Sequence, residues 1–364
     1  MIVKHITDFL EDRFPLSLQE SYDNCGLTYG HKKTALKGIL IALDVTEKIV
    51  EEAINKNCNL IISHHPVIFK GLKKINGREM SERVIELCIR HEIALYAIHT
   101  NLDNHKEGVN KRIADKIGLI NTHILLPQKN TLVKISVFVP EEANDKLSRA
   151  MFAAGAGSIG NYTECSFQSR GQGTFKPNEN AKPTKGNIDQ YSIENEMKLE
   201  FLVPNDRIGS VLQAMKTNHP YEEVAHDIVP LLNERQDMGS GMIGELKNPM
   251  PTAEFLETIK ETFEADVIKH TSLIYDEIKT VAVCGGTGSF LIEQAKRKKA
   301  DIFISSDIKY HEFFDANEEL IIADIGHYES EQYTINLIYE NLKEKFSNFA
   351  LHLTEENTNP VKYI

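Results

Sequence analysis

The sequence predicts an α/β fold in which two α/β halves form one domain that is interrupted by a smaller insert. Apolar β-rich runs alternate with amphipathic stretches between residues 38 and 120, and the same alternation returns between residues 280 and 345. Such alternation is typical of a parallel sheet with crossover helices. The middle of the chain has a different pattern, which predicts a separate ferredoxin-like unit of βαββαβ order.

Three strands and three helices are expected in the first half. The strands are predicted at 38–43, 59–62 and 93–98, and helices follow from about Thr46, near Ser81 and near Val109. The second half repeats this pattern with strands at 280–283, 301–305 and 320–323, a helix at 290–298 and one long amphipathic helix at 328–345. We therefore expect residues 1–126 and 246–364 to form one discontinuous α/β domain.

The insert is predicted to span residues 127–245. Its expected elements are a strand at 132–139, a helix at 143–153, a hairpin at 162–169 and 171–175, a strand at 197–204, a helix at 206–216 and a strand at 225–231. The loop at 176–187 is rich in Asn, Lys and Pro, and it is predicted to be a polar linker between the hairpin and the strand at 197–204.

Composition excludes several classes of protein. A formal charge of -12 over 364 residues disfavours binding to nucleic acid and to anionic membranes. Five scattered cysteines, an odd number without a CxxC pair, indicate neither a disulfide framework nor a thiolate zinc site. No apolar run approaches the ~18 residues that span a bilayer. We expect a cytoplasmic protein without membrane contact.

Histidines and carboxylates gather where predicted strands end. His64 and His65 follow the strand at 59–62, and His99 and Asp103 follow the strand at 93–98. The carboxyl ends of parallel strands are the usual place for ligands in open sheets. Each residue also has a simpler explanation, because one His can cap a turn, the other can face solvent, and an Asp after a strand is often a helix N-cap.

A third group follows the strand at 320–323. His327 and Glu331 are four residues apart, so a helix places them on one face. Acidic residues are also common in the first turn of a helix for dipole reasons, which would account for Glu329 and Glu331 alike. That explanation does not cover three strand ends that all carry His with carboxylates nearby.

Together these residues form a nitrogen and oxygen donor set. It consists of His64, His65, Asp103, His327 and Glu331. Such a set suits Zn, Mn, Fe or Ni rather than Ca, and five donors exceed the four that one tetrahedral ion needs. We expect two divalent metal ions per subunit, with Zn the first expectation, in a hydrolytic dinuclear site.

Motifs in both outer halves resemble the Nif-three-like family, whose members carry the label GTP cyclohydrolase type-two homologue. They are 22–27 (YDNCGL), 42–46 (ALDVT), 63–66 (SHHP), 99–103 (HTNLD), 306–311 (SDIKYH) and the late His327 with Glu331. The resemblance implies a dinuclear metal centre, a toroidal homohexamer and a PII- or CutA-like insert in the longer bacterial members. The segment 219–223 (HPYEE) is similar to a motif of that insert.

Catalytic candidates are His99, Asp307 and His311. Asp307 and His311 follow the strand at 301–305, so either is placed to hydrogen-bond a metal ligand or to transfer a proton. A helix cap and a surface His explain the same pair. The segment 284–289 (CGGTGS) has the context of a phosphate loop. It lacks the Lys of a P-loop and the third Gly of a dinucleotide fingerprint, so a tight turn without ligand is the favoured interpretation.

Two functions are compatible with the sequence. One is a metal-dependent hydrolase that acts on a nucleotide or related heterocycle, for which the family label implies a GTP cyclohydrolase-like, formate-releasing reaction. No residue identifies guanine, so the small-molecule substrate stays open. The alternative is a non-catalytic metal-binding or regulatory protein with a small-molecule-sensing insert.

Overall fold

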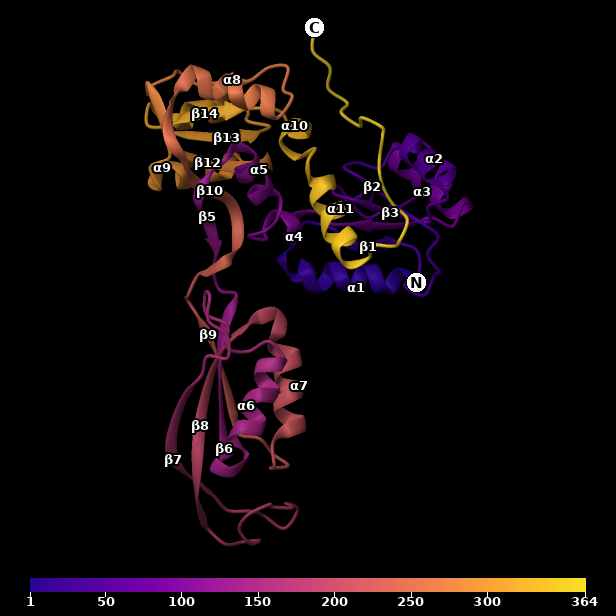
Figure 1. The fold of residues 1–364 in the computed structure, drawn as a ribbon. Helices are drawn as coiled ribbons and strands as arrows, with labels where there is room; N and C mark the ends of the chain where they lie inside the picture. The colour runs from indigo at the N-terminus through magenta and orange to yellow at the C-terminus, as the bar shows by residue number, and fades with distance from the viewer. The chain divides into compact units, whose positions relative to one another are not determined.

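The computed structural model describes residues 1–235 and 237–364, which divide into two compact units (Figure 1). The outer unit contains Met1–Leu126 and Asp237–Ile364, and the inserted unit contains Pro127–Gln236. The expected boundary at 245 is therefore too late. From Met242 onward the chain pairs with Val283 and its neighbours, so these residues belong to the outer unit.

The first sheet of the outer unit has five strands in the order β1-β4-β3-β2-β15. They are β1 (Gly26–Tyr29), β4 (Ala94–Ala97), β3 (Leu60–Ser63), β2 (Ile39–Ala42) and β15 (Leu351–Leu353). β15, β2, β3 and β4 run parallel, and β1 is antiparallel at the edge. Every residue of β2, β3 and β4 is buried, as expected of parallel strands covered on both faces.

The second sheet has six strands in the order β11-β14-β13-β12-β10-β5. They are β11 (Lys269–His270), β14 (Ile321–Asp324), β13 (Ile302–Ser306), β12 (Glu277–Thr287), β10 (Arg235–Pro251) and β5 (Ile120–Gln128). The central strands β12, β13 and β14 are parallel, so their carboxyl ends meet at one edge.

Helices of the outer unit follow most of these strands. They are α1 (Val3–Arg13), α2 (Glu47–Asn55), α3 (Met80–Arg90), α4 (Thr100–Asp103), α5 (Val109–Ile117), α8 (Thr252–Thr262), α9 (Ile292–Arg297), α10 (His327–Glu331) and α11 (Thr334–Lys345), with 3₁₀ turns η1 (Leu16–Leu18), η4 (Ser289–Leu291) and η5 (Tyr310–Ala316). The single helix expected at 328–345 is wrong. Its break falls at Gln332 and Tyr333, whose side chains donate to the carbonyl oxygens of Phe263 and Thr262.

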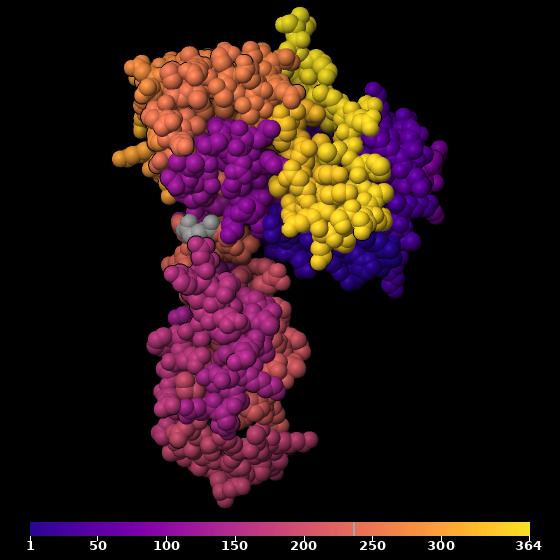
Figure 2. Space-filling view, in the orientation of Figure 1, coloured from indigo at the N-terminus to yellow at the C-terminus, as the bar shows by residue number. Residues whose placement is uncertain are grey.

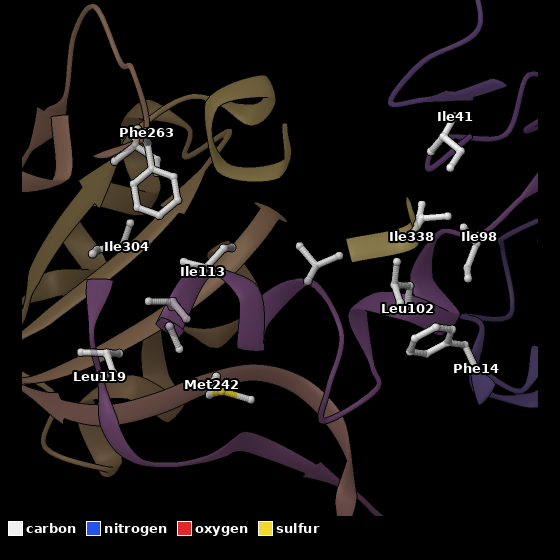
Figure 3. Packing of buried hydrophobic residues seen from close by; sticks show 14 of the residues in the cluster. Phe14, Ile41, Ile98, Leu102, Ile113, Leu119, Met242, Phe263, Ile304 and Ile338 are labelled. Carbon is white, nitrogen blue, oxygen red and sulfur yellow. The ribbon is translucent and has the colours of Figure 1, made fainter. Parts of the chain in front are cut away.

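One apolar core joins the two halves of the outer unit (Figure 3). Ile41 comes from β2 and Ile304 from β13, and Ile113 of α5 and Ile338 of α11 belong to the same cluster. All four side chains are buried. The two sheets are therefore parts of one folded body.

The inserted unit has its own sheet and core. Its elements are β6 (Leu132–Pro140), η2 (Glu141–Ala143), α6 (Asn144–Ala153), β7 (Phe167–Phe175), β8 (Ser192–Pro204), η3 (Asn205–Arg207), α7 (Ile208–Asn218) and β9 (His226–Leu231). The strand order is β7-β8-β6-β9, and each neighbouring pair is antiparallel. The expected hairpin at 162–169 and 171–175 is wrong, because Phe167 to Phe175 pairs without interruption with β8.

No helix among the described residues is both long and apolar enough to cross a bilayer.

Candidate metal centre

The predicted donors come from the ends of three strands in the outer unit. His64 and His65 directly follow β3, Asp103 ends α4 just beyond β4, and His327 and Glu331 begin and end α10 beyond β14. The structure brings all five together, although residue 64 follows a strand of the first sheet and residue 331 follows a strand of the second sheet. Asp103 lies at the end of α4, so the alternative in which it is an N-cap is wrong.

Glu331 Oε2 lies at the centre of this cluster. It is 3.0 Å from His65 Nε2, 3.0 Å from His327 Nε2 and 3.7 Å from His64 Nε2. His64 Nε2 is 3.6 Å from Asp103 Oδ1, and His65 Nε2 is 3.3 Å from His327 Nε2. Donors that bind one zinc ion at ~2.0–2.1 Å lie roughly 3.3 Å apart in a tetrahedron. The donor spacing therefore fits metal coordination.

Two of the donor atoms are buried without a hydrogen-bond partner among the described residues. They are His64 Nε2 and Asp103 Oδ1. Buried polar atoms in folded proteins are nearly always hydrogen-bonded, because an unpaired buried donor or acceptor costs ~1–3 kcal/mol. These two atoms face each other at a distance too long for a hydrogen bond. A cation between them would satisfy both.

Three groups of donors are close enough to hold an ion. They are His64 with Asp103 and Glu331, His65 with His327 and Glu331, and His64 with His65 and His99. Glu331 belongs to two of these groups, so one carboxylate can serve two neighbouring ions.

An oxygen acceptor at Nδ1 orients each imidazole of the cluster. His64 Nδ1 is 2.9 Å from the Ile98 carbonyl oxygen, His65 Nδ1 is 2.7 Å from Asp44 Oδ1, and His327 Nδ1 is 2.7 Å from Asp307 Oδ2. An acceptor at Nδ1 fixes the proton there and leaves Nε2 as a lone-pair donor, as in many metal sites. All three Nε2 atoms point into the cluster.

The electrostatics of the cluster favour positive charge at its centre. Burial would lower the pKa of His65, but hydrogen bonds with Asp44 and Glu331 outweigh it and raise that pKa to about 10. Burial is likewise outweighed at His327, where the Glu331 charge and the Asp307 hydrogen bond raise the pKa to about 11. Burial raises the pKa of Asp103. The field that retains these protons also favours a divalent cation.

Gly286 lets the carboxyl end of β12 approach Glu331. Its φ is +62°, and a Cβ at this position would clash with Glu331 Oε1 and meet His327 Cε1. Only glycine fits both this left-handed backbone and this contact. The sequence shows the Gly-rich segment, but its contact with α10 is visible only in three dimensions.

The three catalytic candidates have different surroundings. His99 lines the same cavity as the cluster, and its Nδ1 is 2.9 Å from Asp23 Oδ1. Asp307 hydrogen-bonds to His327 and accepts from Thr287 Oγ1 at 2.8 Å, with an uncommon φ of +56° for a non-glycine residue. His311 is exposed, packs on Tyr310 and Phe314, and lies outside the cavity lining. The structure does not bring His311 to the site.

Sequence reasoning found only some of the residues that hold the imidazoles in place. Asp44 directly follows the predicted strand at 38–43, and its sequence context favours a helix cap over a residue that supports a metal ligand. The cap is wrong, because α2 begins at Glu47 and Asp44 binds His65. Asp23 has a fully buried side chain and accepts from His99 and from the Thr100 backbone N–H. Thr358 Oγ1 donates to Asp44 Oδ2 at 2.7 Å, and no local pattern points to it.

The cluster lies in a cavity of about 910 Å³ in the outer unit. Residues of the C-terminal segment, including Asn359 and Tyr363, form part of its lining. This segment follows β15 and lies on the surface of the outer unit in yellow (Figure 2). A cavity of this size is typical of a small-molecule site.

Comparison with known families identifies the family of this chain. A family model described as Duf34/NIF3 (NGG1p interacting factor 3) matches residues 1–360. The chain belongs to the NIF3 family.

NIF3 relatives of similar length come from several bacteria. A Bacillus subtilis protein named "GTP cyclohydrolase 1 type 2 homolog" is 35% identical, over 99% of this chain and 98% of its own length. A Halalkalibacterium halodurans protein of the same name is 40% identical, over 86% of this chain and 85% of its own. A crystal structure of a Bacillus cereus protein related to NIF3 has a TM-score of 0.86 at 36% identity, covering 100% of this chain and 99% of that one.

Proposed function

We propose that this NIF3 protein holds two divalent metal ions at His64, His65, Asp103, His327 and Glu331 and hydrolyses a nucleotide or related heterocycle. The observation that carries the proposal is the pair of buried, unpartnered atoms, His64 Nε2 and Asp103 Oδ1, inside a cluster of donors. Glu331 supports two ions rather than one, because it belongs to both donor groups that contain a carboxylate. Zinc suits the donor set, and Mn, Fe or Ni are alternatives.

Bound ions of this kind act as Lewis acids and lower the pKa of coordinated water. The protein's own residues orient the metal ligands and transfer protons. Asp44 and Asp307 hold His65 and His327 with Nε2 toward the site. His99, held by Asp23 at Nδ1, has Nε2 available to accept or deliver a proton in the cavity. Asp307 acts in this proposal as a positioning residue rather than as the acid or base.

The reaction class follows from the name that the relatives carry. A GTP cyclohydrolase opens the purine ring and releases formate, and we extend that reaction to this chain on the name of its homologues alone. The geometry supports hydrolysis in general, because an acidic, metal-binding cavity suits water activation.

A metal and formate assay tests this function. The protein, reconstituted with zinc, is expected to bind about two ions per chain and to release formate from a purine nucleoside or nucleotide. A Glu331→Gln variant should lose both properties, and His311→Ala should retain them. Full zinc occupancy without turnover on a broad panel of heterocycles would favour the non-catalytic, regulatory alternative.

The proposal extends to the architecture and assembly. We assign the inserted unit to the ferredoxin-like class of PII and CutA proteins, which its element order and its β7-β8-β6-β9 strand order support. The metal-binding domain is then discontinuous in sequence, and none of its five donors lies in the insert. The assembly is proposed to be a cytoplasmic homohexamer, on the strength of the family resemblance.

A further inference from the structure

Two aromatic side chains form a wall at one side of the cavity. Tyr22 and Phe69 line the cavity, and their ring centroids are 6.1 Å apart with a tilt of 48°. Phe69 also packs edge-on to His99, with centroids 6.1 Å apart, so the wall continues toward the donor cluster. Tyr22 is 64% exposed and Phe69 is 43% exposed. Large apolar rings this exposed beside a catalytic cavity are surfaces on which a ligand can stack.

The loops that carry the wall are fixed in place. Asn24 Nδ2 donates to the Ile68 carbonyl oxygen at 2.6 Å. Asn24 is two residues after Tyr22 and Ile68 directly precedes Phe69, so this hydrogen bond joins the two loops. The neighbouring Asp23 accepts hydrogen bonds from His99 and Thr100. Both rings therefore have a preorganised position, which lowers the entropic cost of ligand binding.

Two glycines at the end of β12 have backbone N–H groups that are not free to bind a phosphate. Gly285 N–H donates to Asn110 Oδ1 at 3.0 Å, and Gly286 N–H donates to Ser330 Oγ at 3.0 Å. A phosphate loop binds its anion through backbone N–H groups that are free to point at it. These two are occupied by the protein itself.

The charge of the cavity also disfavours a polyphosphate. Its described lining contains seven carboxylates, among them Glu20 and Glu329, and a single Lys or Arg, Lys269. Lys269 Nζ is 2.7 Å from Asp324 Oδ2, so its charge is already paired. Even with two divalent ions bound, the negative charges of the seven carboxylates outnumber the positive charges of the ions and Lys269. Most of these carboxylates already bind protein groups or belong to the proposed metal site. Glu20 and Glu329 each use Oε1 to accept from an Asn side chain, so their second oxygen can accept a hydrogen bond from an N–H donor of a ligand.

We infer that the substrate class of this site is an amino-substituted, planar heteroaromatic compound without a polyphosphate, which stacks on Tyr22 and Phe69. The inference rests on the proposed function and narrows its substrate from a nucleotide or related heterocycle to nucleosides, free bases and similar ring compounds. Tyr22 and Phe69 are specificity residues in this assignment, and the metal-binding cluster lies beyond them.

Paired probes that differ only in phosphate test this substrate class. The probes are guanosine, adenosine and cytidine, each compared with its 5′-triphosphate, and their Kd values are measured by calorimetry on the zinc-loaded full chain. At least one nucleoside should bind, and its triphosphate should bind no tighter. Tyr22→Ala and Phe69→Ala should each weaken nucleoside binding about tenfold, as stacking on an aromatic side chain predicts, and Tyr22→Phe should retain it.

Matched controls use exposed aromatic residues outside the cavity. Tyr310 and Phe314 are 74% and 67% exposed, so Tyr310→Ala and Phe314→Ala should leave binding unchanged. The inference is overturned if no nucleoside binds, if triphosphates bind tenfold tighter, or if the wall variants match the controls. Zinc content is measured on the same samples. Two ions per chain without nucleoside binding overturns this inference alone, whereas nucleoside binding without zinc overturns the proposed metal site alone.

Discussion

Glu331 lies within 3.7 Å of all three imidazoles of the cluster, whereas the hydrogen bond described for Glu329, in the same short helix, is to Asn359. Both carboxylates are buried, and Glu329 Oε1 accepts from Asn359 Nδ2. We therefore expect Glu331→Gln to remove at least one zinc ion per chain after dialysis, and Glu329→Gln to retain wild-type content. Elemental analysis of the two variants makes the comparison. Equal losses would contradict a role for Glu331 as a shared ligand.

Asp44 is the acceptor that fixes the orientation of His65. Removing an acceptor of this kind typically lowers metal affinity ~10–100-fold. Asp44→Ala should show a loss of this size in competition with a chelator, while the far-ultraviolet circular dichroism stays unchanged. Asp8→Ala, which removes an exposed carboxylate of α1, serves as the control. An unaltered zinc affinity in Asp44→Ala would mean that His65 is held by other contacts.

The residues that chemistry requires were predictable, and those that orient them were predictable only in part. Asp307 was expected to hydrogen-bond a metal ligand, and it contacts His327. His64, His65 and Asp103 could be found because strand ends carry ligands in parallel sheets. Asp23 and Thr358 act on residues far away in sequence, so no local spacing reveals them. His311 has the same local context as Asp307, yet the 3₁₀ turn η5 leaves it exposed.

At the level of elements, the carboxyl end of β12 is expected to tolerate no side chain at Gly286. Gly286→Ala should lower the free energy of unfolding by ~1–2 kcal/mol, because of its left-handed backbone, and should also reduce zinc content. Gly118 is a matched control, since its φ is +78° and a Cβ there meets nothing within 4 Å. Gly118→Ala should show the loss of stability without the loss of zinc. Denaturant titration and elemental analysis separate the two effects.

Strong apolar periodicity made most strands of the outer unit predictable, and tertiary contacts explain the errors. β2, β3 and β4 fall within one or two residues of the expected ranges. The break between α10 and α11 depends on hydrogen bonds from Gln332 and Tyr333 to the end of α8, and these long-range contacts cannot be predicted from the local sequence. The edge strands β1, β11 and β15 are short. They are strands because they hydrogen-bond to neighbouring strands far away in sequence, which a local pattern does not show.

At the level of the whole molecule, the inserted unit should be dispensable for metal binding. It has a separate core that includes Val137, Leu199 and Met215, and no proposed donor lies in it. β5 and β10, where the chain leaves and returns, are neighbours in the second sheet, so a short linker can join Leu126 to Asp237. The shortened protein is expected to fold and to bind the same amount of zinc. A folded product by circular dichroism that binds no zinc would show that the insert supplies or orders a ligand.

The intact protein is expected to form an oligomer larger than a dimer. Light scattering at micromolar concentration measures this directly, and the proposed homohexamer predicts a mass of six chains. A monomeric mass would contradict the proposed assembly, while leaving the geometry of the donor cluster untouched.

The central claim is that two ions bind at defined donor groups, and anomalous diffraction at the zinc edge tests it most directly. Crystals of zinc-reconstituted protein should show two anomalous peaks per chain. One is expected among His64, Asp103 and Glu331, and the other among His65, His327 and Glu331. Peaks elsewhere, or none at these residues after reconstitution, would contradict the account.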